Sequence, residues 1–288
     1  MTSVSGVVDG RVQCPPQASE ANYNLREAFP DYPETLGRWR SASREVLQKL
    51  SPSVDVPYGT KPLQNLDFYR AADANAPLLV FIHGGYWQGG DKSDIGFIAG
   101  PFVAAGVSVA VLNYTLAPEA RMEDIVAEVH QAIAWLRHNA ERLSVDVRRI
   151  SLMGHSAGGH LAAMMVVDDG AEASSRFPDV ANVFAISGLF DLPALLPSSV
   201  NNALSLDVQR AEALSPILRL EPQTTKIHTL IGELETTQLH LQSFALAQRW
   251  RQVVAHYVVP GMDHFTVLED LGRASSVYSQ AIVRAING

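Results

Sequence analysis

The chain has 288 residues, of which 47% are hydrophobic and 18% charged, and its formal net charge is −8. This composition supports a globular core, and the negative charge disfavours nonspecific binding to nucleic acid or to an anionic membrane surface. The single cysteine, Cys14, excludes an internal disulfide framework. Without a signal peptide or an apolar run of membrane-spanning length, the sequence predicts a soluble cytoplasmic protein that binds neither nucleic acid nor membrane.

Short apolar strands alternate with helices along most of the chain. Residues 1–20 lack periodicity and predict an irregular N-terminal arm, and a helix is expected from residue 33 to about residue 50. The predicted strands are 66–70, 78–83, 107–113, 149–154, 180–187, 227–232 and 255–260. The other predicted helices are 122–143, 158–167, 238–253 and 271–286.

This alternation predicts a single α/β domain over residues 21–288, with a mostly parallel sheet covered by helices on both faces. Residues 190–222 interrupt the alternation with four prolines and follow directly on a strand end. Ligands of such sheets bind beyond the carboxyl ends of the strands. The segment is therefore predicted to be a lid or pocket wall, in which Asn201 and Asn202 could form hydrogen bonds with a substrate.

The motif G-H-S-A-G occupies residues 154–158, between a predicted strand and a predicted helix. A G-x-S-x-G in that position forms the nucleophile elbow of α/β-hydrolases, where a sharp turn holds the serine in a strained backbone conformation. The expected fold is therefore the α/β-hydrolase fold, and Ser156 is the candidate nucleophile.

A second motif, H-G-G-Y-W at residues 83–87, follows an earlier strand. Glycine-containing loops in this position supply backbone amides that stabilise the oxyanion formed during acyl transfer. Gly85, Tyr86 and Ala157 are the predicted donors. Tyr86 and Trp87 are also predicted to line the substrate pocket, and core packing is the alternative for Trp87.

The general base is predicted from its place in the chain. Nine histidines are present, but only His264 is expected on a loop beyond a strand end and after both the serine and the acid. That order, Ser then Asp/Glu then His, is the one α/β-hydrolases require.

The acid is predicted to be Glu235, which lies a few residues beyond a strand end in the loop Gly-Glu-Leu-Glu. A carboxylate there would orient the imidazole and stabilise its charged form. Glu233, Asp263 and Asp191 remain alternatives, since each also lies near the end of a predicted strand.

These motifs carry a resemblance to a known family. The segments HGGYW at 83–87, GHSAGGHLAA at 154–163 and GMDHF at 261–265 resemble kynurenine formamidases (arylformamidases) and their esterase relatives. They are more distantly similar to hormone-sensitive-lipase-type esterases, and residues 20–44 also resemble the family's N-terminal segment. The chain departs from the family's G-x-x-D pattern by carrying glutamate at position 235.

The resemblance implies that Ser156, Glu235 and His264 form a catalytic triad. It also implies a hydrolase of N-formyl-L-kynurenine that acts in tryptophan catabolism. No cofactor is expected, and no metal site is expected because the sequence has no H-E-x-x-H motif or paired His and carboxylate spacing. A carboxylesterase or amidase for other small acyl compounds is the main alternative, and a non-catalytic binding protein on the same fold is a more remote one. A small molecule is the expected partner, and a homodimer is possible.

Overall fold

The computed structural model describes residues 6–14, 16–167 and 180–288. Its strands are β1 (Gly6–Val8), β2 (Arg11–Gln13), β3 (Ser53–Pro57), β4 (Asn65–Tyr69), β5 (Ala76–Ile82), β6 (Ser108–Leu112), β7 (Val145–His155), β8 (Val180–Ile186), β9 (Lys226–Gly232) and β10 (Val253–Val259). Its helices are α1 (Pro16–Tyr23), α2 (Leu25–Ala28), α3 (Tyr32–Leu50), α4 (Lys92–Ile95), α5 (Ala99–Ala104), α6 (Met122–His138), α7 (Ala140–Leu143), α8 (Ala157–Met164), α9 (Asn201–Leu204), α10 (Val208–Ala213), α11 (Thr237–Arg249), α12 (Thr266–Leu271) and α13 (Val277–Asn287), with 3-10 turns η1 (Gly96–Ile98), η2 (Leu192–Leu195) and η3 (Pro216–Leu218). None of the helices among these described residues is long and apolar enough to cross a lipid bilayer.

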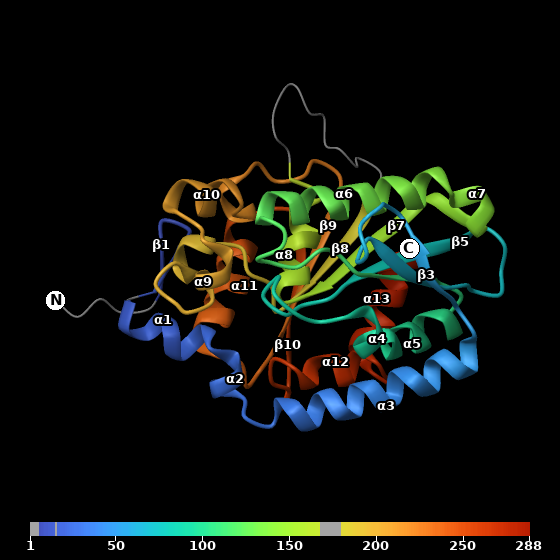
Figure 1. Ribbon diagram of the computed structural model, residues 1–288, viewed down its shortest axis with the longest axis horizontal. Helices are drawn as coiled ribbons and strands as arrows, with labels where there is room; N and C mark the ends of the chain where they lie inside the picture. The colour runs from blue at the N-terminus through green and yellow to red at the C-terminus, as the bar shows by residue number, and fades with distance from the viewer. Residues whose placement is uncertain (1–5, 15, 168–179) are drawn as a thin grey trace.

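One large sheet forms the centre of the molecule (Figure 1). Its strand order is β10-β9-β8-β7-β5-β6-β4-β3, and the strands from β10 to β6 are parallel. Strands β4 and β3 extend the sheet in antiparallel fashion. Every residue of β5 and β6 is buried, because helices cover both faces of these central strands. Their continuous apolar sequences follow from that double coverage.

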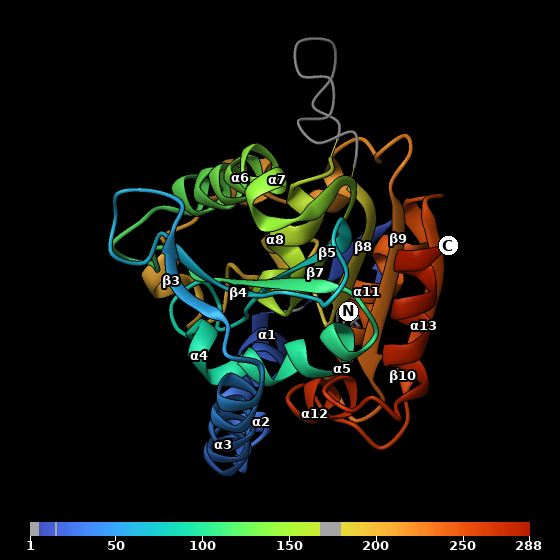
Figure 2. The same cartoon turned by 90° about the vertical axis from the view of Figure 1, so that its right-hand side faces the viewer.

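The two faces of the sheet belong to two hydrophobic clusters. Leu78, Val80 and Ile82 of β5 contribute to the cluster that includes α6, α8 and α11. Leu79 and Phe81, which alternate with them, contribute to the cluster under α3, α5, α12 and α13. Figure 2 shows α6, α7 and α8 on one side of the sheet and α3, α5 and α12 on the other. The mostly parallel α/β-hydrolase sheet predicted from the sequence is confirmed.

The expected strands from 66–70 to 255–260 are all present, with small shifts at their ends. The sequence missed β3, which lies at the sheet edge and is mostly exposed. The final helix predicted near 271–286 is present as α13, but it begins only at Val277, because a break separates it from α12. A Cβ on Gly272 would lie 2.6 Å from the Phe97 ring. Ser276 then begins α13 by accepting hydrogen bonds from the amides of Tyr278 and Ser279.

The prediction of an irregular N-terminal arm is also wrong for its described part. Strands β1 and β2 form an antiparallel hairpin, and α1 begins at Pro16. A residue far along the chain holds the hairpin in place. The Asp191 carboxylate accepts hydrogen bonds from Arg11 Nε (2.9 Å) and Nη2 (3.0 Å) and from the amide of Val12 (2.8 Å). Such tertiary contacts leave no local periodicity in the sequence. Residues 1–5 and 15 of the predicted arm lie outside the described residues.

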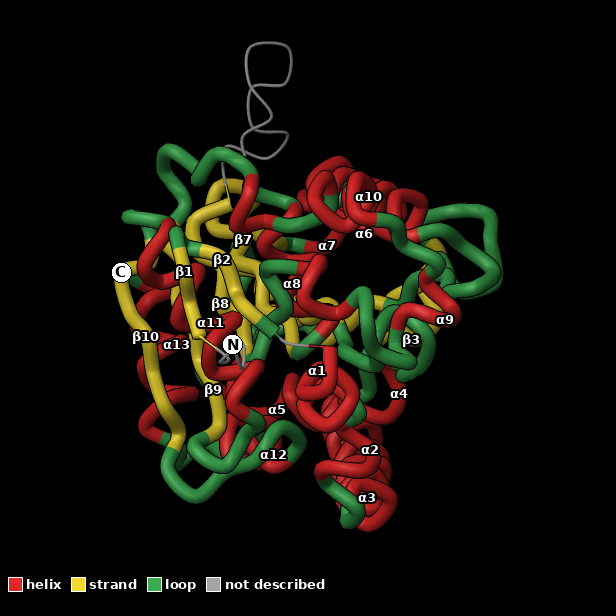
Figure 3. Tube along the Cα trace, turned by 90° about the vertical axis from the view of Figure 1, so that its left-hand side faces the viewer, coloured by secondary structure: helices red, strands yellow, loops and turns green. Residues whose placement is uncertain are grey.

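Helices α1 and α2 lead from this hairpin along one side of the molecule to the long helix α3 (Figure 3). The segment predicted as a lid, residues 190–222, contains the short helices η2, α9, α10 and η3 and no strand. Both segments approach the carboxyl ends of the strands, where they contribute to the walls of the cavity described below.

A buried histidine on α8 makes the stability of the fold dependent on pH. His160 is fully buried, and its Nε2 donates a hydrogen bond to the carbonyl of Leu214 at 2.7 Å. Burial lowers the pKa of His160 to about 4. Below pH 6.5 this histidine is protonated in the unfolded chain, but in the folded chain it stays neutral until the pH approaches 4. This contribution to stability is therefore present above pH 6.5 and is lost as the pH falls towards 4.

We expect the free energy of unfolding of His160→Gln to fall by about 3 kcal/mol less than that of the wild type between pH 6.5 and pH 4. Glutamine can still donate a hydrogen bond to Leu214 but does not titrate. Urea unfolding of both proteins across this pH range measures the difference. His138→Gln, at an exposed position on α6, is the control and should keep the wild-type dependence. Equal dependence in wild type and His160→Gln would contradict the prediction.

Candidate active site

Ser156 lies at the turn between β7 and α8, and its φ and ψ angles are 55° and −118°. L-residues rarely adopt this conformation, and it persists only where the surrounding structure imposes it. The neighbouring glycines explain how the turn fits. A Cβ on Gly154 would lie 2.0 Å from the carbonyl oxygen of Gly158, and one on Gly158 would lie 2.0 Å from that of Ile82. The strained turn expected from the motif is therefore present.

The loop after β5 packs directly on this turn. A Cβ on Gly84 would lie 2.9 Å from the carbonyl oxygen of His155 and 3.0 Å from Ser156 Cβ. Gly85 and Tyr86 both have positive φ angles, of 110° and 52°. Backbone hydrogen bonds among the described residues do not use the amides of Gly85, Tyr86 or Ala157. Among the described residues no backbone carbonyl therefore accepts from these three predicted oxyanion donors, and Gly85 and Tyr86 line the same cavity as Ser156.

His83 fixes the start of the same loop. Its ring stacks on Tyr114 at a centroid distance of 4.4 Å, and its Nδ1 donates to the carbonyl of Gly84 at 2.8 Å. The Tyr114 hydroxyl donates to the His83 carbonyl at 2.9 Å. Burial lowers the pKa of His83, so the neutral ring braces the loop rather than exchanging protons.

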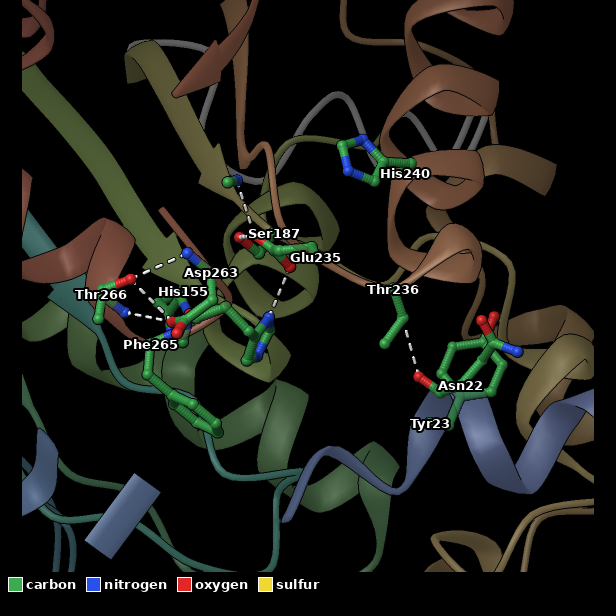
Figure 4. Close-up of polar contacts among 12 residues, drawn as sticks. Asn22, Tyr23, His155, Ser187, Glu235, Thr236, His240, Asp263, Phe265 and Thr266 are labelled. Atoms are coloured by element: carbon green, nitrogen blue, oxygen red, sulfur yellow. Dashed lines mark hydrogen bonds and ion pairs between the residues drawn. The ribbon is translucent and has the colours of Figure 1, made fainter. Parts of the chain in front are cut away.

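The structure brings Glu235 and His264 together. Glu235 Oε2 accepts a hydrogen bond from His264 Nδ1 at 2.7 Å, and the two side chains are 0% and 1% exposed. The other carboxylate oxygen accepts from the Ser187 hydroxyl at 2.5 Å and from the amide of Gly232 at 2.8 Å. Figure 4 shows Glu235 lying beside Ser187. With its proton held on Nδ1, the imidazole keeps Nε2 available to accept a proton.

The three alternative acids have other partners. Glu233 is exposed and accepts from the amide of Gly261 at 2.8 Å. Asp263 accepts from the amides of Phe265 and Thr266, and Figure 4 shows it turned towards Thr266. Asp191 binds the N-terminal hairpin. In this structure, Glu235 is the carboxylate bonded to the His264 ring.

Two residues that the sequence analysis did not single out complete this arrangement. Ser187, with a φ of 51°, directs its hydroxyl at Glu235. His155, the variable residue of the elbow, contacts the carbonyl of His264 through Nε2 at 2.7 Å, and the two rings are 4.6 Å apart. Burial and the adjacent His264 hold the pKa of His155 well below its usual value. A neutral His155 therefore donates this hydrogen bond and holds the His264 backbone in place.

Ser156 and His264 line one cavity of about 520 Å³. Besides the elbow and residues 264–268, three parts of the chain form its walls: the segment after β5, the segment 190–222 and the N-terminal helices. They are joined to one another, because Gln88 Nε2 donates to the carbonyl of Val200 at 2.8 Å and the Ser199 amide donates to Glu20 at 2.7 Å. The Tyr86 hydroxyl also donates to the carbonyl of Tyr23 at 2.7 Å.

One wall of the cavity is aromatic. Phe265 follows His264, and its ring lies 4.3 Å from that of Tyr32 and 6.2 Å from that of Trp39, between centroids. Tyr32, Trp39 and Phe265 all line the cavity. The N-terminal residues of this wall were missed as site residues, although the sequence resemblance extended over them. The wall offers planar surfaces on which an aromatic group can stack.

Of the predicted pocket residues, only Tyr86 lines this cavity. Trp87 is fully buried and contacts the His160 ring edge-on at 5.0 Å, so the core alternative for Trp87 is correct. Asn201 instead closes a turn, because its side chain bonds to both the amide and the carbonyl of Leu206. Asn202 is exposed. Neither asparagine lines the cavity, so the prediction that these two residues and Trp87 line the substrate pocket is wrong.

No group of His, Cys, Asp and Glu side chains suited to a metal ion is found within residues 6–14, 16–167 and 180–288.

Comparisons with known proteins agree with this architecture. The family described as BD-FAE matches residues 66–226. Kynurenine formamidase from Salmo salar is 31% identical over 229 residues, which cover 76% of both chains. Isoprenylcysteine alpha-carbonyl methylesterase from Arabidopsis thaliana is 28% identical over 61% of this chain and 45% of its own. The crystal structure of a provisionally assigned thioesterase from Silicibacter sp. TM1040 superimposes with a TM-score of 0.83 at 28% identity, covering 93% of this chain and 98% of that one.

Proposed function

Because the chain belongs to the kynurenine formamidase family, we propose that it is a serine hydrolase that cleaves N-formyl-L-kynurenine to L-kynurenine and formate. The hydrogen bond from His264 to buried Glu235 is the observation that carries the proposal, because His264 lines the same cavity as Ser156. In a cell the reaction would belong to tryptophan catabolism, as a cytoplasmic step that needs no cofactor.

The first half of the proposed reaction forms an acyl-enzyme. His264 Nε2 takes the proton of the Ser156 hydroxyl as Oγ attacks the formyl carbon. The negative charge moves to the formyl oxygen, where the amides of Gly85, Tyr86 and Ala157 can donate to it. The imidazolium formed on His264 is stabilised by the Glu235 carboxylate, which already accepts its Nδ1 proton.

The second half returns the enzyme to its starting state. The C–N bond breaks as the imidazolium gives its proton to the aniline nitrogen, and L-kynurenine leaves with a formyl ester remaining on Ser156. Water then loses a proton to His264 and attacks the ester carbon. Ser156 recovers its proton from His264 as formic acid leaves, and formic acid then loses a proton to the solvent to give formate.

The shape of the cavity favours an aryl leaving group. The planar side chains of Tyr32, Trp39 and Phe265 stand on one wall, whereas the formyl group needs little space on the acyl side. A carboxylesterase for other small acyl compounds is the second candidate, and the methylesterase relative favours it. The same nucleophile and base would serve both reactions.

A comparison of substrates tests the proposal. We expect kcat/KM for N-formyl-L-kynurenine to exceed that for p-nitrophenyl acetate, although the ester is chemically more reactive. The difference arises because the aromatic wall contacts the kynurenine ring in the transition state. Turnover of the ester without turnover of N-formyl-L-kynurenine would reject the formamidase and favour the carboxylesterase.

A further inference from the structure

The cavity carries a cationic side chain that the proposed triad does not use. Arg26, in α2, is the only lysine or arginine among the described residues that line the cavity. Its side chain is exposed, and within the described part of the chain it has no ion pair or hydrogen bond. In a protein of net charge −8, an unpaired guanidinium at the cavity is a local site of attraction for an anionic group.

Aromatic rings connect the imidazole with the part of the cavity near this cation. The His264 ring lies 5.1 Å from the Phe265 ring, and the Phe265 ring lies 4.3 Å from the Tyr32 ring. Arg26 lies in α2 three residues before Phe29, whose ring is 5.9 Å from the Phe265 ring, and both Arg26 and Tyr32 line the cavity. A ligand that stacks along this wall from His264 would therefore direct its far end towards Arg26.

A negative charge lies in the same part of the cavity. Asp94 lines the cavity, and the pKa of the Tyr32 phenol is raised by burial and also by Asp94. The Asp94 carboxylate is already bound by Arg40, with Nε to Oδ1 at 2.7 Å. Arg40 thus occupies the acid that could otherwise have paired with Arg26.

We propose that Arg26 binds the carboxylate of the substrate's amino-acid group while the aryl ring stacks on Tyr32 and Phe265. This inference rests on the proposed function and adds the residue that selects a charged leaving group. The guanidinium fork can bind a carboxylate through two parallel hydrogen bonds, which an ammonium group cannot reproduce.

Two substrates and one substitution test the role of Arg26. N-formyl-L-kynurenine carries the amino-acid group, and N-(2-acetylphenyl)formamide has the same formamide, ring and ortho carbonyl without it. We expect Arg26→Met to raise KM for N-formyl-L-kynurenine about 10- to 30-fold and to leave kcat nearly unchanged. Both constants for the neutral formamide should stay at wild-type values. Arg26→Lys should restore part of the lost binding.

The control is Arg38→Met. Arg38 is on α3, binds Glu269 at 2.8 Å and does not line this cavity, so its substitution should change neither KM. If Arg26→Met raises KM equally for both formamides, or for neither, the inference is wrong. An equal rise would mean a general disturbance of the wall rather than a lost contact with the carboxylate.

Product inhibition separates this inference from the proposed function. L-Kynurenine should compete with p-nitrophenyl acetate, and Arg26→Met should raise its inhibition constant by the same factor as it raises KM. Failure of the wild type to hydrolyse N-formyl-L-kynurenine would reject the proposed function alone. Absence of inhibition by L-kynurenine, or inhibition that Arg26→Met leaves unchanged, would reject carboxylate binding by Arg26.

Discussion

Replacing Ser156 with alanine is expected to lower kcat by about six orders of magnitude, since the proposed reaction has no other nucleophile. Labelling by a fluorophosphonate probe should disappear in the same variant. Alanine keeps a Cβ at the strained φ of 55°, so the fold should be retained with a melting temperature close to that of the wild type. Stopped assays at high enzyme concentration and gel detection of the probe measure the two effects.

Ser199 provides a matched control, because it also lines the cavity but lies in the 190–222 segment. Ser199→Ala should remain labelled and active. If Ser156→Ala were labelled as strongly as the wild type, the proposed nucleophile would be wrong. Failure of the wild type itself to react would instead favour the non-catalytic binding protein.

Replacing Glu235 with glutamine is expected to lower kcat by about four orders of magnitude. The carboxylate accepts hydrogen bonds from three donors: His264 Nδ1, the Ser187 hydroxyl and the amide of Gly232. A glutamine side chain has one acceptor oxygen and one donor nitrogen, so at least one of these donors would meet an NH2 group. We also expect the free energy of unfolding to fall by about 1–3 kcal/mol. Single-turnover kinetics and urea unfolding measure these changes.

Glu233→Gln is the control, since the Glu233 side chain is exposed and accepts its hydrogen bond from the amide of Gly261 rather than from His264. Its kcat should stay within about threefold of the wild-type value, as for surface substitutions that remove little transition-state stabilisation. The reverse outcome, with a large loss at position 233 and a small one at position 235, would move the acid to Glu233.

The central part of the fold could be predicted because its constraints are local in sequence. Strands buried on both faces read as continuous apolar runs, as β5 and β6 do. The turn at Ser156 needs glycine on each side, and this requirement appears directly in the sequence. The donor loop and the order of acid and base likewise follow from their positions after strand ends. The position of Glu235, whose carboxylate accepts from His264 Nδ1, agrees with the expectation from its loop.

The walls of the cavity could not be predicted in the same way, because contacts between distant segments decide them. The N-terminal hairpin depends on Asp191, about 180 residues further along the chain. Trp87 follows a residue with positive φ and itself has a φ of 58°, which turns its side chain into the core. Asn201 is engaged by Leu206. Residue type alone does not reveal any of these orientations.

The reacting residues and the N-terminal residues of the cavity wall come from different parts of the chain, and this separation affects how substrate selectivity could change. Loops at the strand ends hold Ser156 and His264, whereas Tyr32 and Arg26 come from the N-terminal helices, which pack on the rest of the molecule through contacts such as the hydrogen bond from the Thr236 hydroxyl to the carbonyl of Asn22 (2.9 Å) (Figure 4). Residues 16–50 could thus be exchanged for the corresponding segment of a relative while the reacting groups stay in place. Such a chimera would keep the catalytic residues and take its leaving-group preference from the relative. Exchange of this one segment is therefore a simple way in which new selectivity could evolve or be designed.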